Sequence, residues 1–267
     1  MMLAEAAAAL LGGSLLSAQP VHGGSLSQVI LITLRDGREA IVKGGGAPRI
    51  EAAMLRAIAA AGAPAPQVLA AADGILVMEA MPAGGGLSNA WASLGTALAK
   101  LHTKKGDACG WPDDYAFGPV AIENGAMQNW PAFFAERRLL VNCPHIAPAL
   151  ARRIEALAAD LPNRLPALPQ PSLLHGDLWG GNILASGQRI TALIDPACYY
   201  GHGEIDIAML NLFDSPTPAF YEAYGPLEPG WKERLAIYRL WPALVHVRLF
   251  GSGYRPMVER FLSASGF

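Results

Sequence analysis

Residues 173–184 read "LLHGDLWGGNIL", in which short apolar runs enclose Asp177 and, five residues later, Asn182. A second segment at residues 190–210, "ITALIDPACYYGHGEIDIAML", places Asp195 at the end of another apolar run. Each of these polar residues alone could serve only in a turn or at a strand end, where Asp and Asn are common. Three oxygen-bearing side chains at the ends of adjacent apolar strands are also typical of a site that binds a metal ion and phosphate.

The combination favours phosphoryl transfer over a set of unrelated turns. This reaction needs a group that orients the attacking hydroxyl, oxygen ligands for Mg²⁺, and a cation on the nucleotide phosphates. We predict Asp177 as the catalytic base, with Asn182 and Asp195 as the metal ligands. Gly180 and Gly181 would let the loop turn tightly enough to bring Asn182 beside Asp177.

The composition limits the class of protein. The 267 residues are enough for one large domain or two modest ones. Hydrophobic residues make up 52% of the chain and charged residues 16%, which indicates a packed globular protein rather than a disordered one. The formal net charge of −2 gives no basic surface, so we expect neither nucleic acid nor a membrane as a partner.

The cysteines and the first residues bear on the compartment. Cys109, Cys143 and Cys198 are far apart and form no CxxC pair, so we expect neither a disulfide framework nor a zinc site. The first residues lack a positively charged segment and carry Glu5, so we expect no signal peptide. The sequence contains no run of about 18 apolar residues, so we expect no transmembrane helix. A cytoplasmic location fits these features best.

The first third of the chain predicts a sheet plus one helix. Two β-rich runs at residues 28–34 and 39–43 are joined by "RDGR", and Asp-Gly between such runs predicts a hairpin. Residues 49–62 predict a helix that ends at a glycine, and residues 75–81 predict a short buried strand. The "PAGGG" that follows, at residues 82–86, has the composition of a hinge.

Beyond about residue 87 the spacing of apolar residues becomes mainly helical, and it predicts helices over residues 89–103, 129–140, 147–161 and 231–254. Two short β-like runs interrupt them, and each ends at the polar residues described above. We therefore predict an α+β fold with a small N-terminal antiparallel-sheet lobe, residues 1–82, and a larger, mainly helical lobe, residues 83–267. A cleft between two such lobes is a common place for a small ligand.

The small lobe offers a candidate cation for nucleotide phosphates. Lys43 closes the apolar run "EAIVK", so strand alternation can point it into the cleft, although a surface lysine at a strand end is the alternative. Glu51 lies eight residues later, at the start of the predicted helix, within reach of Lys43. Gly23 and Gly24 precede the first strand of the hairpin and could form a glycine turn over the phosphates.

Several segments together resemble the fructosamine kinase (ketosamine 3-kinase) family of the aminoglycoside phosphotransferase-like kinases. "HGDLWGGN" alone indicates the superfamily, whereas the block from "DPACYYG" to "GEID" and the "CGWPDDYAFG" segment narrow it to this family. "NWPAFFAERRL" and "FYEAYGPLEPGWKERLAIY" agree, and the resemblance runs from about Leu11 to Tyr254. It implies a two-lobed protein-kinase-like fold, with ATP and Mg²⁺ as cofactors.

The resemblance assigns the same chemistry to the residues already selected. Asp177 would be the catalytic base, and Asn182 and Asp195 would bind magnesium. Lys43 would contact the nucleotide phosphates and pair with Glu51.

The resemblance also indicates candidate site residues that the chemistry of the motifs alone does not identify. The backbone of Glu79, Ala80 and Met81 would meet the adenine at the hinge. Glu204 and Asp206 match the E-x-D motif of the family, in which we expect the Asp to brace the catalytic loop.

The sequence determines the roles of three further residues less clearly. Trp179 could stack on a sugar or pack in the core. His175 is a candidate substrate contact that could instead brace the loop by hydrogen bonding. Where the glycine turn of the family usually continues to Asn or His, this sequence has Ser27, which leaves the phosphate contacts of the turn open.

We predict an ATP-dependent kinase that phosphorylates a sugar hydroxyl of ketosamines and so serves deglycation. Two alternatives stay open: a related kinase for aminoglycosides or choline-like substrates, and a nucleotide-binding pseudokinase. Cationic antibiotics would favour an acidic substrate lobe, and a pseudokinase would be expected to lose at least one catalytic residue. The expected partner is a small-molecule or protein-bound ketosamine, and the expected state is a monomer or dimer.

Overall fold

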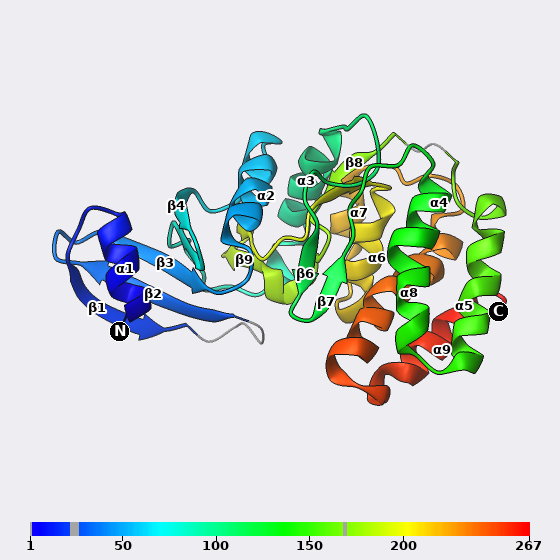
Figure 1. Cartoon of the computed structure of the whole chain (residues 1–267). Helices are drawn as coiled ribbons and strands as arrows, with labels where there is room; N and C mark the ends of the chain where they lie inside the picture. The colour runs from blue at the N-terminus through cyan, green and yellow to red at the C-terminus, as the bar shows by residue number, and fades with distance from the viewer. Residues whose placement is uncertain (1, 22–26, 168–169) are drawn as a thin grey trace.

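The computed structural model of the chain describes residues 2–21, 27–167 and 170–267. An antiparallel sheet lies at one end of an elongated molecule, and a larger, mainly helical part lies at the other (Figure 1). The two termini lie near opposite ends. This arrangement confirms the predicted α+β fold class, with the sheet first and the helices after it. Among the described helices, none is both long and apolar enough to cross a membrane.

The sheet contains five strands in the order β1-β2-β3-β5-β4, and every neighbouring pair is antiparallel. Their bounds are β1 Leu15–Pro20, β2 Gln28–Leu34, β3 Glu39–Gly44, β4 Val68–Ala72 and β5 Ile75–Met78. The predicted hairpin between β2 and β3 is confirmed, with Gly37 at a φ of 86° in its turn. Such a positive φ strongly favours glycine, which explains the Asp-Gly sequence at this position.

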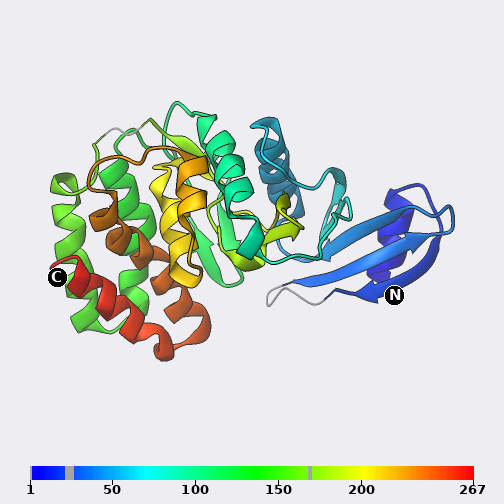
Figure 2. The same cartoon turned by 180° about the vertical axis from the view of Figure 1, so that it is seen from behind.

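Two helices cover the sheet. Helix α1 (Met2–Leu10) buries small residues such as Ala4 and Ala7 against the apolar side chains of β2 and β3. Helix α2 (Pro48–Ala60) packs Ala52 and Leu55 against β5, and its Met54 and Ile58 belong to the large core of the helical part. Both views show α2 between the sheet and α3 (Figures 1 and 2). The position of α2 is therefore tied to both parts of the chain.

The rest of the chain consists of helices, short hairpins and single helical turns. The helices are α3 Trp91–Thr103, α4 Trp130–Phe134, α5 Pro148–Asp160, α6 Glu204–Phe213, α7 Pro218–Tyr224, α8 Trp231–Phe250 and α9 Arg255–Ala264. The paired strands are β6 Tyr115–Phe117 with β7 Val120–Ile122, β8 Ser172–Leu174 with β11 Tyr199–Gly201, and β9 Ile183–Ser186 with β10 Arg189–Leu193. Single 3₁₀ or π turns cover Leu87–Asn89, Ala135–Leu139, Leu140–His145, Leu161–Asn163, Gly180–Asn182 and Ser252–Tyr254.

Three sequence predictions need correction in this part. The helix predicted over residues 231–254 ends at Phe250, because Gly251 adopts a φ of 90°. The helix predicted over residues 129–140 is α4 followed by a π turn and a 3₁₀ turn. The two β-like runs that end at the polar residues are not paired with each other. Strand β10 pairs with β9 in one hairpin, whereas β8 pairs with β11, which lies beyond that hairpin in the chain.

Candidate active site

The loop after β8 holds Asp177 in a conformation that only glycine at position 176 permits. Gly176 has a φ of 83°, and a Cβ atom there would lie 2.0 Å from the carbonyl oxygen of Ala197. Asn182 donates from Nδ2 to Asp177 Oδ2 at 2.9 Å and to the backbone oxygen of Asp177 at 2.9 Å. The predicted turn of the loop therefore does bring Asn182 beside Asp177.

Asp195 stands on the neighbouring segment with a strained backbone. Its φ of 52° is the one positive value among the described residues other than glycine. Strain of this kind at a non-glycine residue is often kept because it aims a functional side chain. The backbone N–H of Ile194 donates to the oxygen of Asn182 at 3.0 Å, so the two predicted metal ligands lie on adjoining strands of backbone.

Lys43 reaches across from β3 to this segment. Its Nζ lies 2.8 and 2.9 Å from the two carboxylate oxygens of Glu51 and 2.9 Å from Asp195 Oδ1. The side chains of Lys43 and Glu51 are almost fully buried, whereas Asp195 remains about one third exposed. The predicted pairing of Lys43 with Glu51 is present, and the surface-lysine alternative is excluded.

Burial and charge act in opposite directions on this ion triad. Burial lowers the pKa of Lys43, but the attraction of Glu51 and Asp195 outweighs it and leaves that pKa raised. For Glu51, burial raises the pKa more than the Lys43 ammonium lowers it.

For Asp177, burial raises the pKa to about 7, against the lowering effect of the Asn182 hydrogen bond. A carboxyl group with its pKa near neutrality is well matched to proton transfer at physiological pH.

Asp206 on α6 holds the loop from behind. It is fully buried and accepts the backbone N–H of His175 at 2.7 Å and that of Gly176 at 2.9 Å. His102 Nε2 also donates to Asp206 at 3.1 Å, and His102 Nδ1 accepts the hydroxyl hydrogen of Tyr224 at 2.8 Å. This geometry agrees with the expectation that Asp206 braces the loop.

Glu204 and His175 both use their side chains in hydrogen bonds within the protein. Both oxygens of Glu204 accept hydrogen bonds from the guanidinium group of Arg234, at 2.6 and 2.7 Å, so Glu204 ties α6 to α8. His175 is fully buried and donates from Nε2 to the carbonyl oxygen of Ile194 at 3.0 Å. The prediction that His175 contacts the substrate is therefore not supported, and the geometry favours a role in bracing the loop.

The predicted adenine contacts directly follow a strand of the sheet. Glu79, Ala80 and Met81 directly follow β5, and the backbone N–H of Glu79 donates to the oxygen of Gln67 at 2.9 Å. Gly23 and Gly24, the predicted glycine turn, lie outside the described residues. The structure therefore places the predicted adenine contacts at the exit of the sheet and leaves the glycine turn as a prediction.

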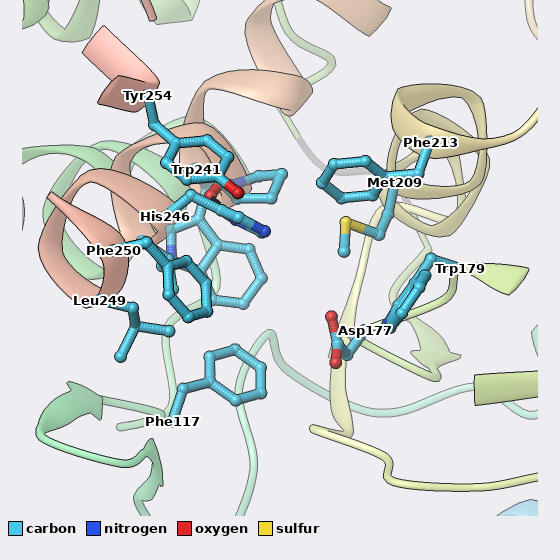
Figure 3. A pocket seen from close by; sticks show the side chains of 13 residues that line it. Phe117, Asp177, Trp179, Met209, Phe213, Trp241, His246, Leu249, Phe250 and Tyr254 are labelled. Carbon is cyan, nitrogen blue, oxygen red and sulfur yellow. Dashed lines mark hydrogen bonds between the residues drawn. The ribbon is translucent and has the colours of Figure 1, made fainter. Parts of the chain in front are cut away.

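Asp177 also faces a cavity of about 360 Å³ (Figure 3). Asp177 and Trp179 lie on one side of it, and Trp241, His246 and Phe250 lie on the other. Trp179 is 38% exposed and packs edge-to-face with Phe213, at 6.1 Å between ring centroids, so it is not a core residue. The complete lining is Phe117, Gly176, Asp177, Trp179, Met209, Phe213, Trp241, Pro242, Val245, His246, Leu249, Phe250 and Tyr254.

The sequence predictions missed the aromatic wall of this cavity. Helix α8 was predicted, but its spacing alone does not say which face would meet the loop that carries Asp177. They also missed Asp214, whose carboxylate accepts the backbone N–H of Gly180 at 2.7 Å and fixes the glycine pair of the loop. The wall depends on the packing of α8 against α6, which only the tertiary structure provides.

Comparison with known proteins identifies the family. A family model described as fructosamine kinase matches residues 7–265. The chain belongs to the fructosamine kinase family. The predicted resemblance is therefore confirmed, and membership implies ATP as the co-substrate. The crystal structure of a protein assigned as a fructosamine-3-kinase from Thermobifida fusca superposes with a TM-score of 0.90 at 30% identity, and the match covers 98% of each chain.

Curated relatives agree. A probable ketoamine kinase from Synechocystis is 38% identical over 201 residues, which is 70% of this chain. The chloroplastic protein-ribulosamine 3-kinase of Arabidopsis thaliana is 34% identical over 191 residues, 67% of this chain. The matched stretches span 66% and 58% of those two relatives, less than two thirds of either. An aminoglycoside phosphotransferase solved with ADP and hygromycin B, at 15% identity and a TM-score of 0.65, shares the fold; its match covers 100% of this chain and 95% of its own.

Proposed function

We propose that this chain is an ATP-dependent kinase that phosphorylates a sugar hydroxyl of ketosamines and thereby serves deglycation. The single observation that carries the proposal is the joint geometry of two sets of side chains. The Lys43 ammonium bridges Glu51 and Asp195, while Asp177, held by Asn182, faces an adjoining cavity. A kinase needs both a phosphate-binding cation and a base that faces the acceptor, and we assign these roles to Lys43 and Asp177.

The proposed nucleotide site lies between the sheet and the helical part. Lys43 would contact the phosphates, with Glu51 holding its ammonium group in place, and the backbone of residues 79–81 would meet the adenine. Gly23 and Gly24 would lie over the phosphates. We propose to divide the chain at residue 82 into a nucleotide-binding lobe and a catalytic lobe, because the sheet ends at Met78.

The donor set fits magnesium. Asn182 uses its amide nitrogen for both bonds to Asp177, so its side-chain oxygen is the atom available for a cation. Asp195 adds a carboxylate that is partly exposed. Hard oxygen donors of this kind, few in number, suit Mg²⁺, which takes its remaining ligands from phosphates and water. A bound Mg²⁺ would neutralise charge on the phosphates during transfer.

Asp177 would act on the acceptor. Its carboxylate accepts the proton of the sugar hydroxyl, whose oxygen attacks the γ-phosphorus of ATP. The bond from that phosphorus to the bridging oxygen of ADP breaks, so ADP leaves and the phosphate ester forms. Asp206 would keep Asp177 in position through the backbone N–H groups of His175 and Gly176.

The lining of the cavity favours a ketosamine over an aminoglycoside. An aminoglycoside carries several ammonium groups, which acidic side chains would have to neutralise. The cavity contains one carboxylate, Asp177, and that group is needed for the chemistry. The pseudokinase alternative is disfavoured because Lys43, Asp177, Asn182 and Asp195 are all present.

The test is a substrate panel. The purified protein is incubated with ATP, Mg²⁺ and fructosamines, ribulosamines or aminoglycosides, and ADP release is measured with the D177N variant as control. We expect ADP release with at least one ketosamine and almost none in the variant. Release with aminoglycosides alone, or equal release by wild type and variant, would reject the proposal.

A further inference from the structure

The cavity beside Asp177 has almost no charge on its walls. Of the 13 residues that line it, Asp177 is the one acid, and neither lysine nor arginine is among them. Six of the 13 residues are Phe, Trp or Tyr, among them Phe117 of β6, Phe213 of α6, and Trp241 and Phe250 of α8. A sugar ring with several hydroxyls would leave most of them unpaired against such a surface, at a cost in free energy.

The exposed large aromatic side chains of the described residues all lie at this cavity. Eight large hydrophobic residues of the described chain are exposed, and the three aromatic ones, Trp179, Phe213 and Phe250, all line this cavity. Their exposed fractions are 38%, 43% and 50%. Large apolar surface that stays exposed in one place usually marks a binding site.

His246 supplies one polar atom within the aromatic wall. Its Nδ1 lies 2.8 Å from the carbonyl oxygen of Pro242, and because a carbonyl can only accept, Nδ1 carries the hydrogen. Burial lowers the pKa of His246, which favours the neutral ring with Nε2 as an acceptor. Its ring is packed among Phe213, Phe250 and Tyr254, with centroid distances of 5.0 to 5.4 Å, and points into the cavity (Figure 3).

We infer that this aromatic cavity binds the amine side of the ketosamine, and that it selects amines with a compact apolar substituent over amines with an acidic one. The inference rests on the proposed function, which places the sugar hydroxyl at Asp177. The protonated secondary amine next to the sugar then meets the aromatic faces, which attract cations, and His246 Nε2 accepts an N–H hydrogen. The substituent beyond the amine lies among Trp241, Phe250 and Phe117, where a carboxylate would lose its hydration without gaining a partner.

A matched pair of substrates tests the selection. N-butyl-fructosamine and N-(3-carboxypropyl)-fructosamine share the sugar, the amine and nearly the same length, and differ in one terminal carboxylate. We expect kcat/KM to be at least about tenfold higher for the butyl compound, because the cavity offers the carboxylate no cation. Equal kcat/KM values for the two compounds would overturn the inference and leave the proposed function intact.

Phe250 provides a variant that should fold normally, because half of its surface is already exposed. We expect Phe250→Lys to reverse the preference, since the new ammonium pairs with the carboxylate, whereas the butyl chain loses its apolar contact with the Phe250 ring. Leu16→Lys is the matched control: Leu16 is 58% exposed on β1, and this variant should keep the wild-type ratio. An unchanged ratio in Phe250→Lys would reject the inference.

A binding measurement separates the two proposals. Calorimetric titration of each compound without ATP reports the cavity alone. If no ketosamine of the panel is phosphorylated, these two compounds included, but the butyl compound binds more tightly and Phe250→Lys reverses that order, the proposed kinase function is rejected and the cavity assignment stands. If both are phosphorylated but bind equally well, the cavity assignment is rejected.

Discussion

Replacement of Lys43 by Met should destabilise the protein through the partner that is left behind. Glu51 is 4% exposed, and without the ammonium its remaining donor is the Tyr115 hydroxyl at 3.4 Å. Removing one member of a buried ion pair costs about 3–5 kcal/mol in the free energy of unfolding. At about 2–4 °C per kcal/mol for chains of about this size, Tm should fall by roughly 6–20 °C.

The double variant Lys43→Met/Glu51→Gln separates this cause from a general loss of packing. It removes both buried charges with little change in volume, so much of the lost stability should return. We expect the loss in the double variant to be smaller than the sum of the two single losses by about 2 kcal/mol. Denaturant unfolding of the wild type and the three variants measures this coupling. If the losses simply add, the buried pair is not the reason for the instability of Lys43→Met.

The same variants also test nucleotide binding. Saturating Mg-ATP, at about 100 times Kd, should stabilise the wild type by about 2.7 kcal/mol, because it binds the folded state only. Both Lys43→Met and the double variant should lose most of this ligand-induced rise in Tm, although the double variant regains stability. A normal rise in either variant would contradict the phosphate-binding role of Lys43.

Three further predictions concern the catalytic loop, the metal ligand and the packing behind them. Asp177→Asn should lower kcat by about 10²–10⁴-fold, because it removes a positioned base. Tm and ATP affinity should change little, because Asn has nearly the same size as Asp; steady-state turnover and thermal melting decide this. Asp195→Asn should weaken activity and Mg²⁺-dependent ATP binding together, which titration of ATP at several Mg²⁺ concentrations would show; loss of one without the other contradicts a metal-ligand role. Gly95→Ala should reduce the free energy of unfolding by more than about 2 kcal/mol, although alanine favours helices, because its Cβ would lie 2.3 Å from the carbonyl oxygen of Phe220 in α7; an unchanged denaturation midpoint would refute this.

Local chemistry was enough to select the residues of the proposed site. Three oxygen donors in two short loops, Asp177, Asn182 and Asp195, together indicate a metal and phosphate site. Strand alternation predicts that Lys43 points inward. The structure brings Lys43 within 2.9 Å of Asp195, although 152 residues separate them in the chain. The hairpin at Gly37 was also predictable, since its turn depends on two neighbouring residues.

The pairing of the short strands and the shape of the acceptor cavity depended on tertiary structure. The sequence gives β8 and β10 similar apolar runs, but which strands pair depends on the loops that bring β11 back to β8. The aromatic wall joins side chains from β6, α6, α8 and the turn at Tyr254, which are distant along the chain. A motif fixes its own neighbours through bonds and turns, whereas a cavity is the space left between elements after they pack, and no local pattern encodes that space.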